Sequence, residues 1–293
     1  MNEYRGSHPL LLGMFVILII SLYSPVLAHN FSTNESAAFL AMADALKAEV
    51  QLVQQNLANN NMSLASDHAN KALVLITDDI NKEIAERNQR LSDDLIADLA
   101  SLKASTESAS GNNTGSDTDL LVDDINGIID EIVSARIDPD QLNNSTTQAL
   151  RIVELVDKLL TNYGDAYAVG FDMTNMSMMM GNNSNGMTSM PMDTTTGGST
   201  PINTNTSTSD ATLVNTTDYQ SAQALAIKVQ ELFDSEIMNT SPKSSGTAVD
   251  NIASTLQELV TSIDSKASPI DVMTIVHTKL HPNLITAFDL KVR

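Results

Sequence analysis

The chain contains no cysteine among its 293 residues, and this absence removes several kinds of chemistry. Without a thiol there is no disulfide, no cysteine nucleophile, no haem-attachment motif and no cysteine-ligated iron–sulfur cluster. Positively charged residues are also scarce. The chain has 16 lysines and arginines against 36 aspartates and glutamates, and its formal charge is −20 at pH 7. Such a chain would be repelled by nucleic acid and by anionic lipid, so neither is expected as a partner.

Aromatic residues make up only 4% of the chain, and no stretch shows the alternation of aromatic or β-branched residues that is typical of strands. P-loop, G-x-G-x-x-G, H-E-x-x-H and G-x-S-x-G motifs are lacking as well. We therefore expect no sheet and no enzymatic activity. The acidic pairs at 78–79, 93–94 and 123–124 lie in no EF-hand loop and do not indicate a calcium site.

The first 28 residues indicate an export signal. Residues 10–23 are almost continuously apolar, and Val26-Leu27-Ala28 offers small residues for cleavage before His29. An uncleaved membrane anchor is the alternative, although the apolar run is shorter than the ~20 residues that span a bilayer. We expect a secreted or extracytoplasmic (pseudoperiplasmic) protein, cleaved or tethered by its N-terminus. Eleven Asn-x-Ser/Thr sequons follow the signal and are consistent with glycosylation of an exported chain.

Helical periodicity covers most of the remaining chain. Apolar residues recur at three- and four-residue steps over 35–60, 63–78, 80–102, 119–136, 144–163, 219–238, 247–265 and 269–290. The second and third segments form either one bent helix or two, and Gly164 is the expected stop of the fifth. The fold class that we predict is all-α, with antiparallel amphipathic helices in one or two bundles.

The composition divides the chain into four parts. We expect a signal peptide at 1–28, an N-terminal helical region at 29–172, a Met-rich low-complexity linker at 173–217 and a C-terminal helical region at 218–293. The Asn, Ser, Thr and Gly of the linker cannot build a core, so we expect it to be disordered. Residues 43–51 resemble 222–230, and 122–133 resemble 249–260, which indicates either an internal duplication or the chance likeness of amphipathic helices.

The linker carries the clearest chemical pattern. Met-Thr-Asn-Met-Ser-Met at 173–178 is followed by Met-Thr-Ser-Met-Pro-Met at 187–192. A thioether is a soft, neutral donor that suits Cu(I) and binds without losing a proton. We predict copper as the bound metal and the tract's eight methionines as its ligands: Met173, Met176, Met178, Met179, Met180, Met187, Met190 and Met192. A neutral spacer is the alternative interpretation.

A second candidate metal site involves histidines. Met273, His277 and His281 follow at four-residue steps and share one side of the last predicted helix. Two imidazoles with a thioether suit copper, and we predict that His68 joins them if 63–78 packs against 269–290. The alternative is that these are hydrogen-bonded core histidines, because the same positions form apolar stripes. Pro282 is also expected to disturb the spacing of the pair.

The export signal, the methionine tract and the ending Val-His-Thr-Lys-Leu-His-Pro-Asn-Leu at 276–284 together resemble uncharacterised secreted helical proteins of ammonia-oxidising archaea. The tract also resembles the methionine motifs of copper transporters and copper-resistance proteins. These resemblances imply extracytoplasmic copper binding, buffering or delivery, with an extracytoplasmic copper protein as partner. The rival hypothesis is a cell-surface structural or protein-interaction module without a metal.

Overall fold

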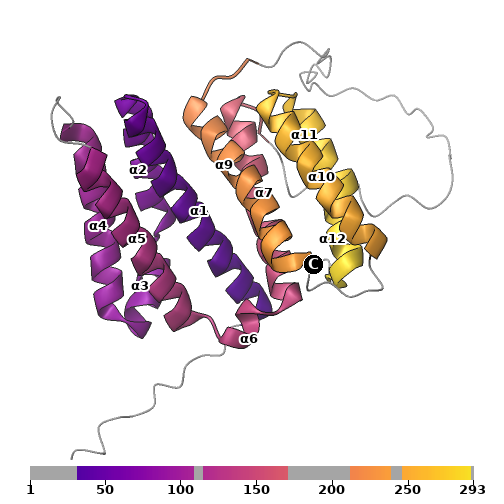
Figure 1. Cartoon of the computed structure of the whole chain (residues 1–293), viewed down its shortest axis with the longest axis horizontal. Coiled ribbons are helices and arrows are strands. Elements are labelled where there is room, and N and C mark those ends of the chain that lie inside the picture. The colour runs from indigo at the N-terminus through magenta and orange to yellow at the C-terminus, as the bar shows by residue number, and fades with distance from the viewer. Residues whose placement is uncertain (1–31, 109–114, 171–211, 239–245, 292–293) are drawn as a thin grey trace, which may run out of the picture. The chain divides into compact units, whose positions relative to one another are not determined.

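The computed structural model describes residues 32–108, 115–170, 212–238 and 246–291. The chain divides into two units, 1–32 and 33–293, and all of the helices named below belong to the second. Every regular element in these described ranges is a helix, and none of their residues forms a strand. The predicted all-α fold class is therefore confirmed, and Figure 1 shows the longer helices lying side by side.

Five helices enclose the first hydrophobic core, which we call the N-terminal cluster. They are α1 (Thr33–Ala58), α2 (Met62–Leu75), α3 (Asp78–Arg87), α4 (Gln89–Ser108) and α5 (Gly115–Arg136). α1 packs on α2, α2 on α4, α4 on α5 and α5 again on α1, so that the four long helices close into a bundle. The largest fully buried side chains inside it include Leu46, Leu91, Leu95, Leu99, Leu102 and Ile125.

The second core, which we call the C-terminal cluster, combines α7 (Ser145–Ala166) with the helices that come after the predicted linker. These are α9 (Thr216–Leu232), the π-helical η2 (Phe233–Ile237), α10 (Gly246–Asp264), α11 (Pro269–Ile275), the π-helical η4 (Val276–Leu280) and α12 (His281–Phe288). α7 packs along α9, and both α11 and α12 also contact α7. The division between the two cores thus falls near the short helix α6 (Pro139–Leu142), before α7, and not at the methionine tract.

α1 belongs to both cores because apolar residues occupy two of its faces. The stripe that includes Leu46, Val50 and Val53 faces the N-terminal cluster, as the periodicity predicted. A second face carries Ala41 and Ala45, which are buried in the C-terminal cluster. Small side chains let α7 and α9 approach the α1 backbone closely, and a helix buried on two sides needs apolar residues on both.

The similar stretches do not repeat in the same order along the two clusters. Residues 43–51 lie in α1 and 122–133 in α5, which are the first and last helices of the N-terminal cluster. Residues 222–230 and 249–260 lie in α9 and α10, the second and third long helices of the other cluster. A simple tandem duplication would place matching stretches at matching positions in both bundles.

Several helix boundaries differ from the predicted ones. The segment predicted at 80–102 is split at Asn88 into α3 and α4, and Thr77 caps α3 by accepting a hydrogen bond from the Ile80 amide. Gly164 does not end α7, which continues to Ala166. The turn is made instead by Ala168 at a φ of 55°, with the Val169 amide donating to the Gly164 carbonyl at 2.8 Å.

Two of the sequon asparagines cap helices. The side-chain oxygen of Asn144 accepts from the Thr146 and Thr147 amides at the start of α7. Asn215 accepts in the same way from the Asp218 amide at the start of α9. Asparagine is among the best N-cap residues, so capping is a structural reason for these two residues beside glycosylation.

Candidate functional site

The predicted methionine tract, 173–192, lies outside the described residues, and its copper binding stays a prediction. The described part of the chain contains four methionines. Met42 is 7% exposed in the N-terminal cluster, whereas Met273 packs half-buried against the C-terminal cluster. Both cores are therefore built mainly from Leu, Ile, Val and Ala, without any described contribution from the tract's thioethers.

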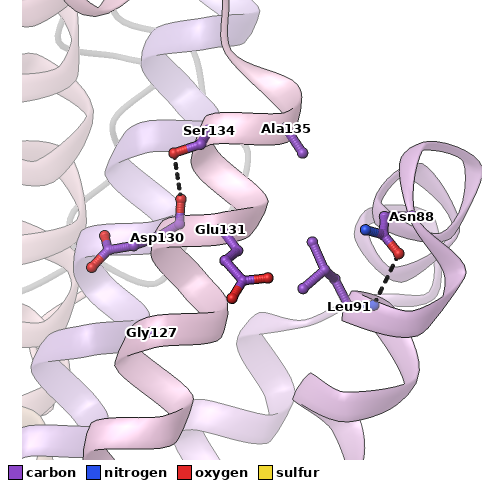
Figure 2. Close-up of a pocket in the computed structure, with 7 residues that line it drawn as sticks. All are labelled: Asn88, Leu91, Gly127, Asp130, Glu131, Ser134 and Ala135. Atoms are coloured by element: carbon purple, nitrogen blue, oxygen red, sulfur yellow. Dashed lines mark hydrogen bonds between the residues drawn. The ribbon is translucent and has the colours of Figure 1, made fainter.

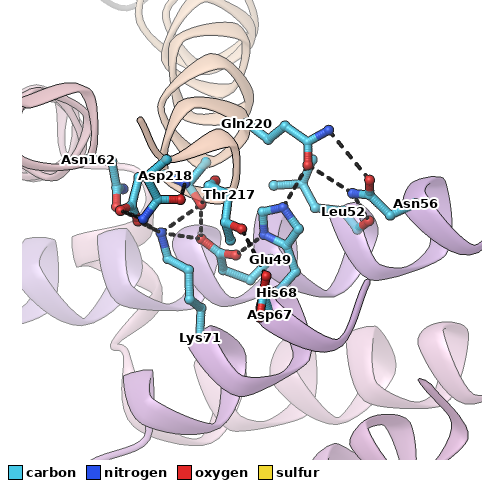
Figure 3. Close-up of polar contacts among 12 residues, drawn as sticks. Glu49, Leu52, Asn56, Asp67, His68, Lys71, Asn162, Thr217, Asp218 and Gln220 are labelled. Atoms are coloured by element: carbon cyan, nitrogen blue, oxygen red, sulfur yellow. Dashed lines mark hydrogen bonds and ion pairs between the residues drawn. The ribbon is translucent and has the colours of Figure 1, made fainter. Parts of the chain in front are cut away.

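His68 is fully buried on α2 and has a hydrogen-bond partner on each ring nitrogen. Its Nδ1 lies 2.7 Å from Glu49 Oε2 on α1, and its Nε2 lies 2.9 Å from Gln220 Oε1 on α9. Both ring nitrogens are thus engaged within the protein, as in a hydrogen-bonded core histidine. Figure 3 shows His68 between its two partners.

The contacts of Glu49 extend this arrangement into a buried polar network. Its second carboxylate oxygen accepts from Ser221 Oγ at 2.7 Å and lies 3.8 Å from Lys71 Nζ. Lys71 in turn donates to Asp218 at 2.7 Å and to Asn162 on α7 at 3.0 Å (Figure 3). The network joins α1 and α2 to α7 and α9. Because its charges are paired within the protein, we interpret it as a structural clamp between the two clusters.

His68 does not meet the C-terminal histidines. The packing neighbours of α2 are α1, α4 and α9, and both His68 ring nitrogens are bonded within that group. The predicted convergence required α2 to lie against the last helix, but α11, η4 and α12 pack against α7 and α10 instead. The four-residue site is not formed, and for His68 the core-histidine alternative describes the structure.

His277 and His281 do lie together. Their ring centroids are 5.2 Å apart with the rings edge to face. The residues between them form the π-helical turn η4, in which the His281 amide donates to the Val276 carbonyl. Pro282, which lacks an amide hydrogen, follows at the start of α12. The proline therefore lies beside a local widening of the helix, and the two rings remain neighbours.

Asp157 on α7 faces this pair and was not among the predicted site residues. Its Oδ1 lies 3.8 Å from His281 Nε2. Burial raises the pKa of Asp157 to about 6, and the nearby charge of Glu154 adds to this shift. Burial, helped by the charge of His277, lowers the pKa of His281 to about 4. At pH 7 the carboxylate is ionised and the His281 ring is neutral, so the 3.8 Å separation does not represent an ion pair.

The sequence carried only a weak sign of Asp157. It lies one residue after Val156 and two before Leu159, both fully buried, so a carboxylate stands at the edge of the apolar face of α7. Periodicity gives the register of α7, but not which helix lies opposite position 157. Met273, the thioether predicted beside the histidines, packs against the C-terminal cluster, and its role as a ligand stays a prediction. Within the described ranges, no group of three or more His, Asp or Glu side chains is arranged so that it could hold a metal ion.

A shallow pocket lies elsewhere, between the start of α4 and the C-terminal half of α5. It is lined by Asn88, Leu91, Gly127, Asp130, Glu131, Ser134 and Ala135, as Figure 2 shows. Its two carboxylates already have partners, because Lys47 donates to Asp130 and Arg90 donates to Glu131. These ion pairs leave the pocket without an uncompensated charge for a ligand, and we do not assign it a function.

Comparison of the chain with protein-family models, with curated proteins and with solved structures gave no match. Among the described residues, no helix is both long and apolar enough to cross a membrane. Arguments about function therefore depend on the residues themselves.

Proposed function

We propose that the chain is an extracytoplasmic metal-binding protein that binds, buffers or delivers copper through its methionine motifs. The observation that carries this proposal is the repeated Met-x-x-Met-x-Met spacing at 173–178 and 187–192. The two hydrophobic clusters are closed by other residues, so nothing in the described packing explains why methionines gather in this stretch. Thioether sulfur is a soft donor that favours Cu(I).

The helical bundles would then serve as a carrier for the tract. Helix α7 ends at Ala166 and α9 begins at Thr216, and the two helices pack along each other. The helices that precede and follow the tract in the sequence are thus neighbours in one helix pair. The proposed partners are a copper ion and an extracytoplasmic copper protein that exchanges it.

The experiment compares the mature chain with a variant in which residues 173–192 are replaced by a Gly/Ser segment of equal length. Both proteins are titrated with Cu(I) in competition with a chromophoric Cu(I) chelator under anaerobic conditions. We expect the mature chain to withdraw Cu(I) from the chelator and the replaced variant to lose that ability. Equal Cu(I) binding by both proteins would contradict the proposal.

The second candidate function is a structural or interaction module of the cell surface. The observation that favours it is the buried network around Glu49 and His68, which clamps the two clusters into a rigid body without using a ligand. On this hypothesis the tract is only a spacer. Its replacement would leave the binding of partners unchanged, and neither form of the chain would compete for Cu(I).

A further inference from the structure

Three polar atoms without hydrogen-bond partners come together on the C-terminal cluster. They are Asp157 Oδ1, His277 Nε2 and His281 Nε2, all inaccessible to solvent. Buried polar atoms are nearly always hydrogen-bonded, and each exception needs an explanation such as a water or an ion. The three exceptions here belong to side chains on adjoining elements, α7, η4 and α12. One bound species can satisfy all of them.

The local geometry keeps these groups in place. The π-helical turn of η4 and the proline at the start of α12 hold the two rings with their centroids 5.2 Å apart. The neighbouring Val276, Leu280 and Leu284 are fully buried, so their packing fixes the helix from which both rings project. π-Helical turns within helices occur frequently at functional sites, where they reposition side chains.

The chemistry of the three groups suits a divalent transition-metal ion. Two imidazoles and one carboxylate are ligands that Zn²⁺ and Cu²⁺ prefer. The Asp157 carboxylate would supply negative charge to the cation.

As they stand, these side chains are not arranged so that they could hold a metal ion, and the distance between Asp157 Oδ1 and His281 Nε2 must shorten for one to bind. Metal–ligand bonds of about 2.0–2.1 Å place neighbouring ligand atoms of a tetrahedral site roughly 3.3 Å apart. Asp157 Oδ1 and His281 Nε2 are 3.8 Å apart, about half an ångström too far for a closed shell. The Asp157 side chain is 41% exposed, so it can rotate toward the rings without disturbing the core.

We propose that Asp157, His277 and His281 form a second metal site, specific for a borderline divalent ion of the Zn²⁺ or Cu²⁺ type and separate from the methionine tract. The carboxylate comes from α7 and the imidazoles come from the helix opposite. Binding therefore ties the segment before the tract to the last helix of the chain. The site goes beyond the proposed Cu(I) function and does not depend on it.

The test uses Zn²⁺ as the probe, because thioethers bind it poorly and the tract is then silent. The mature chain with 173–192 replaced by Gly/Ser is titrated with Zn²⁺ in competition with a fluorescent zinc chelator. We expect one Zn²⁺ per chain, and a loss of affinity of about tenfold or more in Asp157→Asn and in His281→Gln. Asp123→Asn on α5 removes an exposed carboxylate of the same type and should leave the affinity unchanged.

Melting curves provide a second measurement that does not depend on the chelator. Zn²⁺ should raise the Tm of the parent chain and fail to raise that of the His277→Gln/His281→Gln double variant, because only a folded site binds. Circular dichroism checks that each variant is folded. If a histidine variant does not fold, the comparison of Asp157→Asn with the parent chain is used instead. Equal Zn²⁺ affinity of Asp157→Asn and Asp123→Asn, or an equal Tm rise in the double variant, would overturn the proposal. Neither result would bear on Cu(I) binding by the tract.

Discussion

Arg151 on α7 holds Asp44 on α1 through two parallel hydrogen bonds, from Nε to Oδ2 at 2.5 Å and from Nη2 to Oδ1 at 2.7 Å. The Asp44 side chain is only 6% exposed and that of Arg151 14%. A planar guanidinium matches a carboxylate in this two-pronged way, and burial strengthens the attraction between the two charges. The pair joins the helix shared by both clusters to the first helix of the C-terminal cluster.

Removing either partner of this pair should destabilise the fold strongly. Asp44→Ala leaves the Arg151 guanidinium without its carboxylate, and Arg151→Ala leaves Asp44 with only the more distant Lys228, whose Nζ lies 4.0 Å from Oδ1. Each change should cost roughly 3 kcal/mol in the free energy of unfolding. The double variant should cost less than the sum of the two single variants, because no charge is then left alone. Urea unfolding followed by circular dichroism measures all three. Additive losses would show that the two charges do not stabilise each other.

An exposed ion pair provides the control. Lys279 and Glu258 are 2.7 Å apart, but their side chains are 49% and 43% exposed. Solvent screens such a pair, so Glu258→Ala should cost less than about 1 kcal/mol. A loss as large as that of Asp44→Ala would mean that burial is not the reason for the difference.

The turn after α7 offers a stabilising substitution. Ala168 adopts a φ of 55°, a left-handed conformation that favours glycine, while the Val169 amide closes the turn on Gly164. Ala168→Gly should raise the free energy of unfolding by up to about 1 kcal/mol. The matched control is Ala100→Gly at an exposed position inside α4, which should lower it by about 1 kcal/mol. Two changes of the same sign would contradict the conformational explanation.

The sequence predicted the fold class well because helical periodicity records which face of each helix is buried. The stripe of α1 that includes Leu46 and Val50 illustrates this success. Periodicity does not record which helices become neighbours. It therefore missed that α7 packs with α9, α11 and α12, and that the alanine face of α1 forms a second contact. The break between α3 and α4 at Asn88 was also missed, because the apolar pattern continues across this residue and does not indicate where a helix ends.

The same limitation applied to the candidate site. The proximity of His277 and His281 follows from their four-residue spacing, which the sequence states directly. The position of His68 depended on tertiary packing, and α2 lies against α1, α4 and α9. Asp157 was missed for the same reason, since a carboxylate at the edge of an apolar face becomes informative only when the helix opposite is known.

The hydrogen bonds of His68 predict a structural role that can be separated from metal binding. His68→Ala leaves Glu49 buried at the clamp without its imidazole partner, so it should cost roughly 3 kcal/mol in the free energy of unfolding. At temperatures where the variant is folded, its Zn²⁺ and Cu(I) affinities should equal those of the parent chain. A selective loss of metal affinity with unchanged stability would reinstate His68 as a ligand.

We expect Asp98 on α4 to make the free energy of unfolding depend on pH. Burial raises the pKa of Asp98, and the charges of Asp124 and Asp94 raise it further. The folded state therefore binds this proton more tightly than the unfolded state, so the contribution favours folding in acid and is lost as the pH rises above the ordinary value of 3.8. Asp98→Asn should raise the Tm at pH 7 and make little difference near pH 3.

Salt and a second variant check this interpretation of Asp98. Part of the effect is repulsion between carboxylates, so the gain at pH 7 should shrink in about 1 M NaCl. Asp123→Asn, at an exposed position of α5, should give a smaller gain. If Asp98→Asn raises the Tm equally at pH 3 and pH 7, the gain does not come from the ionised carboxylate.

The proposed binding of Cu(I) by the sulfur atoms of the tract is tested by a Cu(I) affinity measurement on point variants of the chain. In one variant Met173, Met176, Met178, Met187, Met190 and Met192 become leucine, which preserves size and hydrophobicity but removes every thioether of the two motifs. In the control, six Asn, Ser and Thr residues of the same stretch become alanine. We predict that the leucine variant loses Cu(I) competition with the chelator while the control retains it, and that X-ray absorption of the parent chain shows sulfur ligation. Undiminished Cu(I) binding by the leucine variant would contradict the account.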